Sequence, residues 1–269
     1  MKFFISIIHL CHKVLESYCE NSLMHNSHYL YLAVVLGCFM IPFLFSFHPS
    51  LQFHKKWKEL SKGLVVMMAF FIPWDIYFTS IGIWGFSEDY TIGIKIFHLP
   101  LEEWLFFICI PYACVFTYHC MKFFFKKEPF PIASRYLAFL MACIFMIVAF
   151  VYTNRWYTFS AHLLSGSFLL LHLFVFRSKY LGWYMLTFVL ISPLFLMSNG
   201  VLTGITFWEY PFLNDEVHNI ANSIVWYNND HNIQFRLFTM PIDDVAYGML
   251  MLLLTTTGYE KFQATRKPN

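Results

Sequence analysis

Seven apolar runs of about 20 residues follow one another along this chain, and they constrain its fold more than any other feature. The runs cover residues 29–47, 63–84, 100–120, 134–153, 157–176, 180–202 and 239–258. A helix needs about 20 mostly apolar residues to cross a bilayer. Only 13% of the residues are charged, against about 25% in soluble domains. The sequence therefore predicts an all-α fold, a polytopic membrane bundle of about seven transmembrane helices.

The positive charges predict how this bundle is oriented. Thirteen of the 18 Lys and Arg residues flank the runs on one side of the membrane. These residues are Lys55, Lys56, Lys58, Lys62, Lys122, Lys126, Lys127, Arg135, Arg177, Lys179, Lys261, Arg266 and Lys267. Because positive residues collect on the cytoplasmic side, we expect a multi-pass protein of the cell membrane with its N-terminus outside and its C-terminus in the cytoplasm. Residues 1–28 form an extension in which Met24 is an alternative start, and residues 263–269 form a tail.

Two acidic pairs, each placed behind a proline, open two of the apolar runs. The first is Pro100-Leu101-Glu102-Glu103 and the second is Pro241-Ile242-Asp243-Asp244. A third acid, Asp75, lies in a run that carries no other charge. A charged carboxylate costs roughly 2.5 to 3.5 kcal/mol at mid-membrane on insertion scales. An acidic pair that occurs twice in this context therefore indicates a functional role. The simpler interpretation is helix capping for the pairs and a structural hydrogen bond for Asp75.

The residues upstream of the two pairs also match, which predicts an internal repeat. Asp75, Thr79 and Ile81 precede the first pair, and Asn199, Thr203 and Ile205 precede the second at the same spacing. We expect two parallel three-helix repeats, residues 29–132 and 157–262, joined by a connector helix within 133–156. The second repeat carries a 17-residue insertion in the long 203–240 connection. In this arrangement the polar residues converge on one pocket in the outer half of the bilayer.

These motifs resemble the membrane-embedded lycopene cyclases, namely the small subunits of heterodimeric bacterial enzymes and the cyclase domain of fungal bifunctional enzymes. The resemblance covers residues 29–260 and is that of a fused, two-repeat cyclase. In the first half it rests on Pro73-Trp74-Asp75, Trp84-Gly85-Phe86, Gly93, Pro100-Leu101-Glu102-Glu103 and Phe106-Phe107; in the second it rests on Asn199, Thr203, Arg236, Pro241, Asp243-Asp244 and Tyr247. The second pair departs from Glu-Glu, and its side chains are shorter. The resemblance implies that the acyclic ends of lycopene become β-ionone rings without net redox change.

The acidic residues suit that chemistry. Ring closure needs a proton delivered to an alkene, and an apolar site favours the neutral form of a carboxyl group. We expect Glu102 or Glu103 to be the general acid and Asp75 to be an orienting or proton-accepting group. Asp243 and Asp244 form a second acidic element. This scheme requires no metal and no cofactor.

Aromatic and polar residues beside the acids are candidate contacts for the substrate. They are Trp74, Thr79, Trp84, Trp104, Phe107, Asn199, Thr203 and Tyr247. Aromatic faces stabilise a desolvated cation by on the order of 1 to 2 kcal/mol each. Taken alone, Trp74, Trp84, Trp104 and Phe106 are more typical of a helix core or an interfacial belt than of a substrate contact.

The expected partners are lycopene and the lipid bilayer, with other enzymes of the carotenoid pathway as candidates. A net charge of +2 does not favour nucleic acid. Three other functions stay open. A carotenoid hydratase would capture the same cation with water. A membrane prenyltransferase or elongase would use acids to hold Mg²⁺ and diphosphate. A proton-linked carrier would place acids at a repeat interface.

Overall fold

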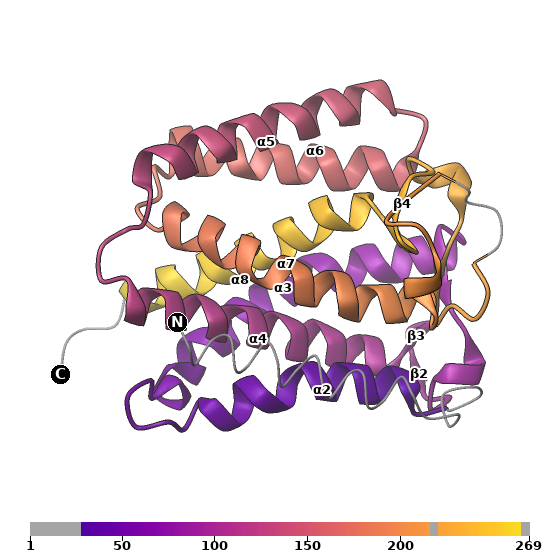
Figure 1. Ribbon diagram of the computed structural model, residues 1–269, viewed down its shortest axis with the longest axis horizontal. Coiled ribbons are helices and arrows are strands. Elements are labelled where there is room, and N and C mark those ends of the chain that lie inside the picture. Colours follow the sequence, from indigo (N-terminus) through magenta and orange to yellow (C-terminus); the bar gives the residue numbers. More distant parts are fainter. Residues whose placement is uncertain (1–27, 216–219, 265–269) are drawn as a thin grey trace.

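The computed structural model describes residues 28–215 and 220–264. The proposed start at Met24, nearly all of the 1–28 extension and residues 265–269 of the tail lie outside this part. The described residues form seven α-helices that lie side by side in an elongated bundle (Figure 1). The helices are α2 (Leu30–Phe45), α3 (Trp57–Ser80), α4 (Leu101–Phe124), α5 (Pro131–Val151), α6 (Trp156–Leu170), α7 (Leu181–Thr203) and α8 (Asp243–Ala264).

Five helical segments are long and apolar enough to cross a membrane, which supports a membrane bundle. They are Phe53–Ser80, Leu101–Phe124, Pro131–Val151, Trp156–Val175 and Leu181–Thr203. Two of these extend an α-helix, because η2 (Phe53–Lys56) leads into α3 and the π-helical turn η4 (Leu171–Val175) continues α6. Helix α2 is apolar but has only 16 residues. Each of the seven predicted runs coincides with a helix.

Short antiparallel strands join the helices at one end of the bundle, and the all-α prediction did not include them. They are β1 (Trp84–Phe86), β2 (Lys95–Ile96), β3 (Leu99–Pro100), β4 (Leu213–Asn214), β5 (Val225–Tyr227), β6 (Arg236–Leu237) and β7 (Met240–Pro241), with the 3-10 turns η3 (Glu88–Tyr90), η5 (Phe207–Glu209) and η6 (Asn229–His231). Strand β1 pairs with β5, β2 pairs with β3, and β6 lies between β4 and β7. The strands gather at the right-hand end of the bundle in Figure 1.

The two acidic pairs follow two hairpins of the same construction. In the first hairpin Lys95 pairs with Pro100, and in the second Arg236 pairs with Pro241. Each proline ends a short strand, a position that tolerates the missing N–H group. Phe97 and Phe238, which occupy equivalent positions in the two turns, have φ values of 51° and 55°. Both prolines therefore precede their helix, and each acidic pair enters the first turn of α4 or α8.

Helices of the first half pack closely against helices of the second half. Helix α3 packs mainly against α8, while α4 contacts α2, α7 and α8. At the crossing of α3 and α8, a Cβ atom on Gly258 would lie 2.7 Å from the Cα atom of Gly63. Two glycines thus permit close approach of the backbones, as in other membrane helix pairs. Helix α5 packs against α6 and α7 at the upper edge of Figure 1.

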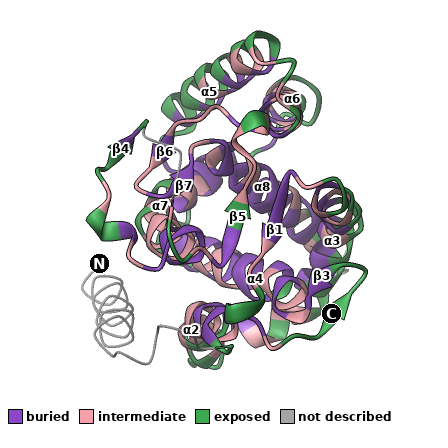
Figure 2. Cartoon of the chain, turned by 90° about the vertical axis from the view of Figure 1, so that its right-hand side faces the viewer, coloured by how far each residue is buried: buried purple, intermediate pink, exposed green. Residues whose placement is uncertain are grey.

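Strand pair β1–β5 crosses the end of the bundle and links the two halves (Figure 2). Its register places Trp84 opposite Tyr227, Gly85 opposite Trp226 and Phe86 opposite Val225. The connection between α7 and α8 supplies β5, so part of this long segment lies over the end of the bundle. The acidic helix starts and this strand pair consequently lie at the same end.

Candidate active site

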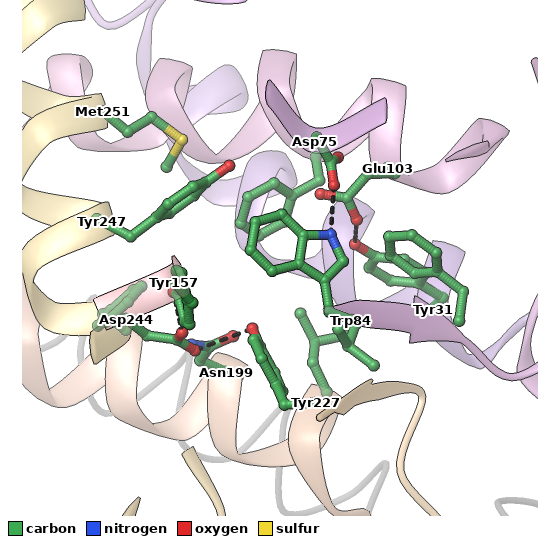
Figure 3. Close-up of a pocket in the computed structure, with 16 residues that line it drawn as sticks. Tyr31, Asp75, Trp84, Glu103, Tyr157, Asn199, Tyr227, Asp244, Tyr247 and Met251 are labelled. Atoms are coloured by element: carbon green, nitrogen blue, oxygen red, sulfur yellow. Dashed lines mark hydrogen bonds between the residues drawn. The ribbon is translucent and has the colours of Figure 1, made fainter. Parts of the chain in front are cut away.

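A cavity lies at this end, between the two halves. Its walls come from α2, α3, α4, α6, α7 and α8 and from strands β1 and β5. The lining residues are Tyr31, Asp75, Trp84, Phe86, Glu103, Phe106, Tyr157, Phe195, Asn199, Leu202, Val225, Tyr227, Asp244, Tyr247, Gly248 and Met251. Figure 3 shows Asp75 and Glu103 on one side of this cavity and Asp244 on the other.

The first carboxyl cluster joins α3 to α4. The indole nitrogen of Trp84 donates a hydrogen bond of 2.6 Å to Asp75 Oδ1, and Thr79 lies at 3.5 Å from the same oxygen. The other oxygen, Asp75 Oδ2, is buried and has no hydrogen-bond partner among the described residues. Glu103 accepts a hydrogen bond from the hydroxyl of Tyr31. Asp75 and Glu103 are close enough for their charges to interact, so α3 and α4 bring two carboxyl groups to one point.

The second cluster surrounds Asp244 with hydrogen-bond donors. The side-chain amide of Asn199 donates to Asp244 Oδ2 over 2.7 Å, and the hydroxyl of Tyr227 lies 3.2 Å from the same oxygen. The hydroxyl of Tyr157 donates to Asp244 Oδ1. Both oxygens therefore accept hydrogen bonds, whereas Asp75 has one oxygen without a partner among the described residues.

The first member of each acidic pair does not line the cavity. Glu102 Oε1 instead accepts from the backbone N–H of Ile92 over 2.7 Å, and Asp243 Oδ2 accepts from that of Ile233 over 3.2 Å. Asp243 Oδ1 also accepts a hydrogen bond of 2.6 Å from Thr158. Glu102 and Asp243 thus anchor the loop that precedes their own helix, while the next residue along faces the cavity.

Tyr247 lines the cavity and is the centre of an aromatic cluster. Its ring centroid lies 5.2 Å from that of Trp74, 4.9 Å from that of Phe71 and 6.2 Å from that of Trp84. The ring centroid of Tyr157 lies 6.2 Å from that of Tyr247 and 5.1 Å from that of Trp84. Rings from three helices, α3, α6 and α8, and from β1 therefore meet between the two carboxyl clusters, where their faces are able to stabilise positive charge.

A buried cation lies next to the second cluster. Arg236 is only 4% exposed; its guanidinium donates to the backbone carbonyl of Thr239 over 2.5 Å and to Asn229 Oδ1 over 2.9 Å. Burial lowers the pKa of Arg236, whereas the charges of Asp244 and Asp243 act in the opposite direction. Because an arginine stays protonated in proteins, this end of the cavity holds a permanent positive charge.

The sequence profile of the lycopene cyclase family matches residues 28–121 and 154–262, which is most of the chain. The chain belongs to the lycopene cyclase family. Bifunctional lycopene cyclase/phytoene synthases of three fungi are similar to parts of it. The relative in Aspergillus niger is 38% identical over 47 residues (18% of this chain and 8% of that protein), and the one in Aspergillus oryzae is 31% identical over 62 residues (23% and 11%).

The relative in Podospora anserina is 26% identical over 99 residues, which are 37% of this chain and 15% of that protein. This cyclase-family chain therefore aligns with less than a sixth of the length of each of these relatives. No solved structure matches the chain.

Several residues predicted to contact substrate do not line the cavity. Trp74 packs on Tyr247, and Phe107 is fully buried against Phe71. Trp104 is half-buried, with its indole nitrogen 3.3 Å from the carbonyl oxygen of Ile96. The remaining two are hydroxyl residues. Thr79 lies beside Asp75, and Thr203 donates to the backbone carbonyl of Asn199 over 2.9 Å. Of the eight predicted contacts, Trp84, Asn199 and Tyr247 line the cavity.

Sequence reasoning missed three tyrosines that bind the carboxyl groups: Tyr31, Tyr157 and Tyr227. Tyr31 and Tyr157 each occupy the second position of a helix, α2 and α6. Extending the repeat comparison to the first helix of each half would have found this pair. Burial, followed by the charge of Asp244, raises the pKa of Tyr227 well above its usual value, so Tyr227 stays a neutral donor.

Proposed function

We propose that this protein converts the acyclic ends of lycopene into β-ionone rings by acid-initiated cyclisation without net redox change and without a cofactor. One observation carries the proposal. Carboxyl groups from α3, α4 and α8 face a single cavity walled by aromatic rings, in a chain that belongs to the lycopene cyclase family. A polyene end in this cavity would meet a proton source and a surface that stabilises cations.

In this mechanism Glu103 and Asp75 supply the proton. Tyr31 and Trp84 each hold one of these two groups in place. Protonation of the terminal double bond creates a tertiary cation, and an internal double bond attacks it to close the ring. The faces of Trp84 and Tyr247 would stabilise the cation by on the order of 1 to 2 kcal/mol each. Loss of a different proton from the ring then completes the product.

Glu102 and Asp243 support this chemistry indirectly. Each accepts a backbone hydrogen bond from the loop before its helix. We assign them the role of fixing the first turn of α4 and α8, which in turn aims Glu103 and Asp244 at the cavity. They are positioning residues in this scheme.

The scheme also includes two parallel repeats, residues 29–132 and 157–262, with α5 as connector within 133–156. Matching contacts support it. The backbone N–H of Leu101 donates to the carbonyl of Ile94 over 2.9 Å, and that of Ile242 donates to Phe235 over 3.1 Å, at equivalent positions. The family match leaves out residues 122–153, which contain α5. Seven membrane-spanning helices, including α2 and α8, complete the architecture.

We place the protein in the cell membrane with its N-terminus outside and its C-terminus in the cytoplasm. The distribution of Lys and Arg supports this orientation. Lycopene would then enter from the bilayer, and other enzymes of the carotenoid pathway are the natural protein partners. The cavity end of the bundle would face outwards.

The decisive experiment expresses the chain in cells that accumulate lycopene and identifies the carotenoids by chromatography and mass spectrometry. We expect cyclic products, with β-carotene if both ends react. A hydroxylated acyclic product would indicate a hydratase and a longer chain an elongase. Unchanged lycopene, with the protein present in the membrane fraction, would contradict the proposal and favour a carrier.

A further inference from the structure

The two ends of the cavity provide opposite surroundings for a carboxyl group. Asp244 accepts hydrogen bonds from Tyr157, Asn199 and Tyr227 and interacts with the buried charge of Arg236. A carboxylate only accepts hydrogen bonds, and donors on both oxygens favour its charged form. The surroundings of Asp244 are therefore those of an anion.

The other end offers no comparable support for a negative charge. Glu103 interacts with Tyr31, Asp75 and Glu102, and no cation of the described chain is among these groups. Lys95, the counterpart of Arg236 in the first hairpin, is exposed and pairs with Glu88 over 2.6 Å. Two adjacent carboxylates without a cation would repel each other in an apolar site. A proton shared between Asp75 and Glu103 removes that repulsion.

We propose that Asp244 is a permanent carboxylate that serves as counter-charge to the carbocation, and that the reactive proton resides on the Asp75–Glu103 pair. This assignment rests on the proposed cyclisation and gives the two halves different tasks. The free oxygen of Asp75, buried and without a partner, is the acceptor position that a proton would occupy. Asp244 lies on the opposite side of the cavity, where a cation between the two clusters would face it (Figure 3).

The carboxyl pair donates one proton and recovers one proton in each turnover. The pair adds its proton to the terminal carbon–carbon double bond, which forms a C–H bond and a cation. The π electrons of an internal double bond form the ring C–C bond, and the positive charge moves onto the ring. The vacated carboxylate then removes a proton from a ring carbon, whose C–H electrons become the new double bond. Asp244 keeps its charge throughout and exchanges no proton.

Other ionisable groups around the cavity fit this division. They are Tyr31 from α2, Tyr157 from α6, Tyr227 from β5, and Asp243 and Tyr247 from α8. His162 Nδ1 lies 3.7 Å from Asp243 Oδ1, on the side of Arg236. Every basic group near the carboxyl groups therefore belongs to the second cluster within the described part of the chain.

Infrared difference spectroscopy of the purified protein in lipid, without substrate, tests the assignment directly. A protonated carboxyl group has a carbonyl band that is separate from carboxylate bands and shifts in heavy water. We expect Asp75→Asn and Glu103→Gln to remove intensity from this band, while Asp244→Asn leaves it unchanged. Loss of the band in Asp244→Asn, or its persistence in both other variants, would overturn the proposal.

A second pair of variants covers the case in which Asp244→Asn fails to fold. Arg236→Met removes the buried cation, and we expect a new protonated carboxyl band to appear. That band should be absent from the double variant Arg236→Met/Asp244→Asn. Lys95→Met is the matched control at the equivalent, exposed position, and it should leave the spectrum unchanged. An unchanged spectrum for folded Arg236→Met would contradict the inference.

Ring formation measured in lycopene-loaded vesicles completes the test. Removing a fixed charge partner from a developing cation costs about 100-fold in rate by analogy with oxyanion-hole donors, so we expect that loss for Asp244→Asn. Absence of cyclic product from the wild-type protein would refute the proposed function, whereas the infrared result on substrate-free protein would still decide the protonation states. A full rate for Asp244→Asn would refute the counter-charge role alone.

Discussion

The two halves of the molecule use nearly the same backbone to build two different carboxyl sites. In the first half Asp75 and Glu103 face each other, with one close donor each from Trp84 and Tyr31. In the second half the position of Asp75 belongs to an amide, Asn199, which donates to Asp244. One exchange of a carboxyl for an amide thus turns a like-charge pair into a charge–donor pair. In the proposed scheme, this one polar substitution is enough to separate the acid of one half from the anion of the other.

The largest expected effect separates the members of the first acidic pair. Glu103→Gln should lower the rate of ring formation by about 100-fold or more, the usual loss when a general acid is removed. Glu102→Gln should retain most activity, because a glutamine oxygen still accepts the hydrogen bond from the N–H of Ile92. Product analysis in lycopene-producing cells, at matched membrane levels, measures both. Equal loss in the two variants would break the distinction between cavity-facing and loop-facing acids.

The next effect comes from making the second half resemble the first. Asn199→Asp replaces a donor to Asp244 with a second carboxyl group. Hydrogen bonds to charged groups contribute about 1.5 to 3 kcal/mol, so the rate should fall by roughly 10- to 100-fold. Asn199→Leu is a control that removes the donor without adding an acid, and it should be less harmful. An Asn199→Asp variant as active as the wild type would show that Asp244 does not need this donor.

Removal of single tyrosine hydroxyls should have smaller and unequal effects. Tyr157→Phe deletes a donor to Asp244, and Tyr31→Phe deletes one to Glu103. A hydrogen bond to a charged group contributes about 1.5 to 3 kcal/mol and one between neutral groups about 0.5 to 1.5 kcal/mol. Because Glu103 shares a proton with Asp75 whereas Asp244 carries a full charge in our assignment, we expect the Tyr157 variant to lose more rate. A greater loss for Tyr31→Phe would reverse the assignment of charge to the two halves.

The smallest effect concerns the helix crossing that joins the halves. Gly258→Ala would place a methyl group 2.7 Å from the Cα atom of Gly63, so α3 and α8 must separate. Overpacking of this kind costs typically 1 to 3 kcal/mol, and we expect a lower melting temperature in detergent. Gly37→Ala on α2 is the control, because its added Cβ meets no atom within 4 Å. Equal melting temperatures would show that this crossing tolerates side chains.

The sequence predicts the parts of this structure that depend on periodicity and charge. The apolar runs predict all seven helices, and the duplicated acids place Asp75, Glu103 and Asp244 at one cavity. The sequence could not show that Glu103 rather than Glu102 faces the cavity. The rotation of the first helical turn depends on which of the two side chains binds the preceding loop, and here it is Glu102. Lycopene cyclase family membership follows from the same motifs and is confirmed by the family match.

The strands escaped prediction because two- and three-residue segments carry no period. Pro100 and Pro241 each close a hairpin before their helix begins, a pairing that the capping interpretation of the sequence did not include. The donors to the carboxyl groups depend on this loop geometry. Tyr227, for example, reaches Asp244 only because β5 lies against β1. Residues that act through long-range pairing therefore required coordinates.

Strand pair β1–β5 has a mechanical consequence. Trp84 and Tyr227 stand directly across this ladder from each other, and each bonds a carboxyl group of a different half. A displacement of either strand would drag both partners at once. The paired strands therefore couple the two carboxyl clusters mechanically. A movement of the cavity wall at one cluster would be transmitted to the other through the backbone hydrogen bonds of β1 and β5.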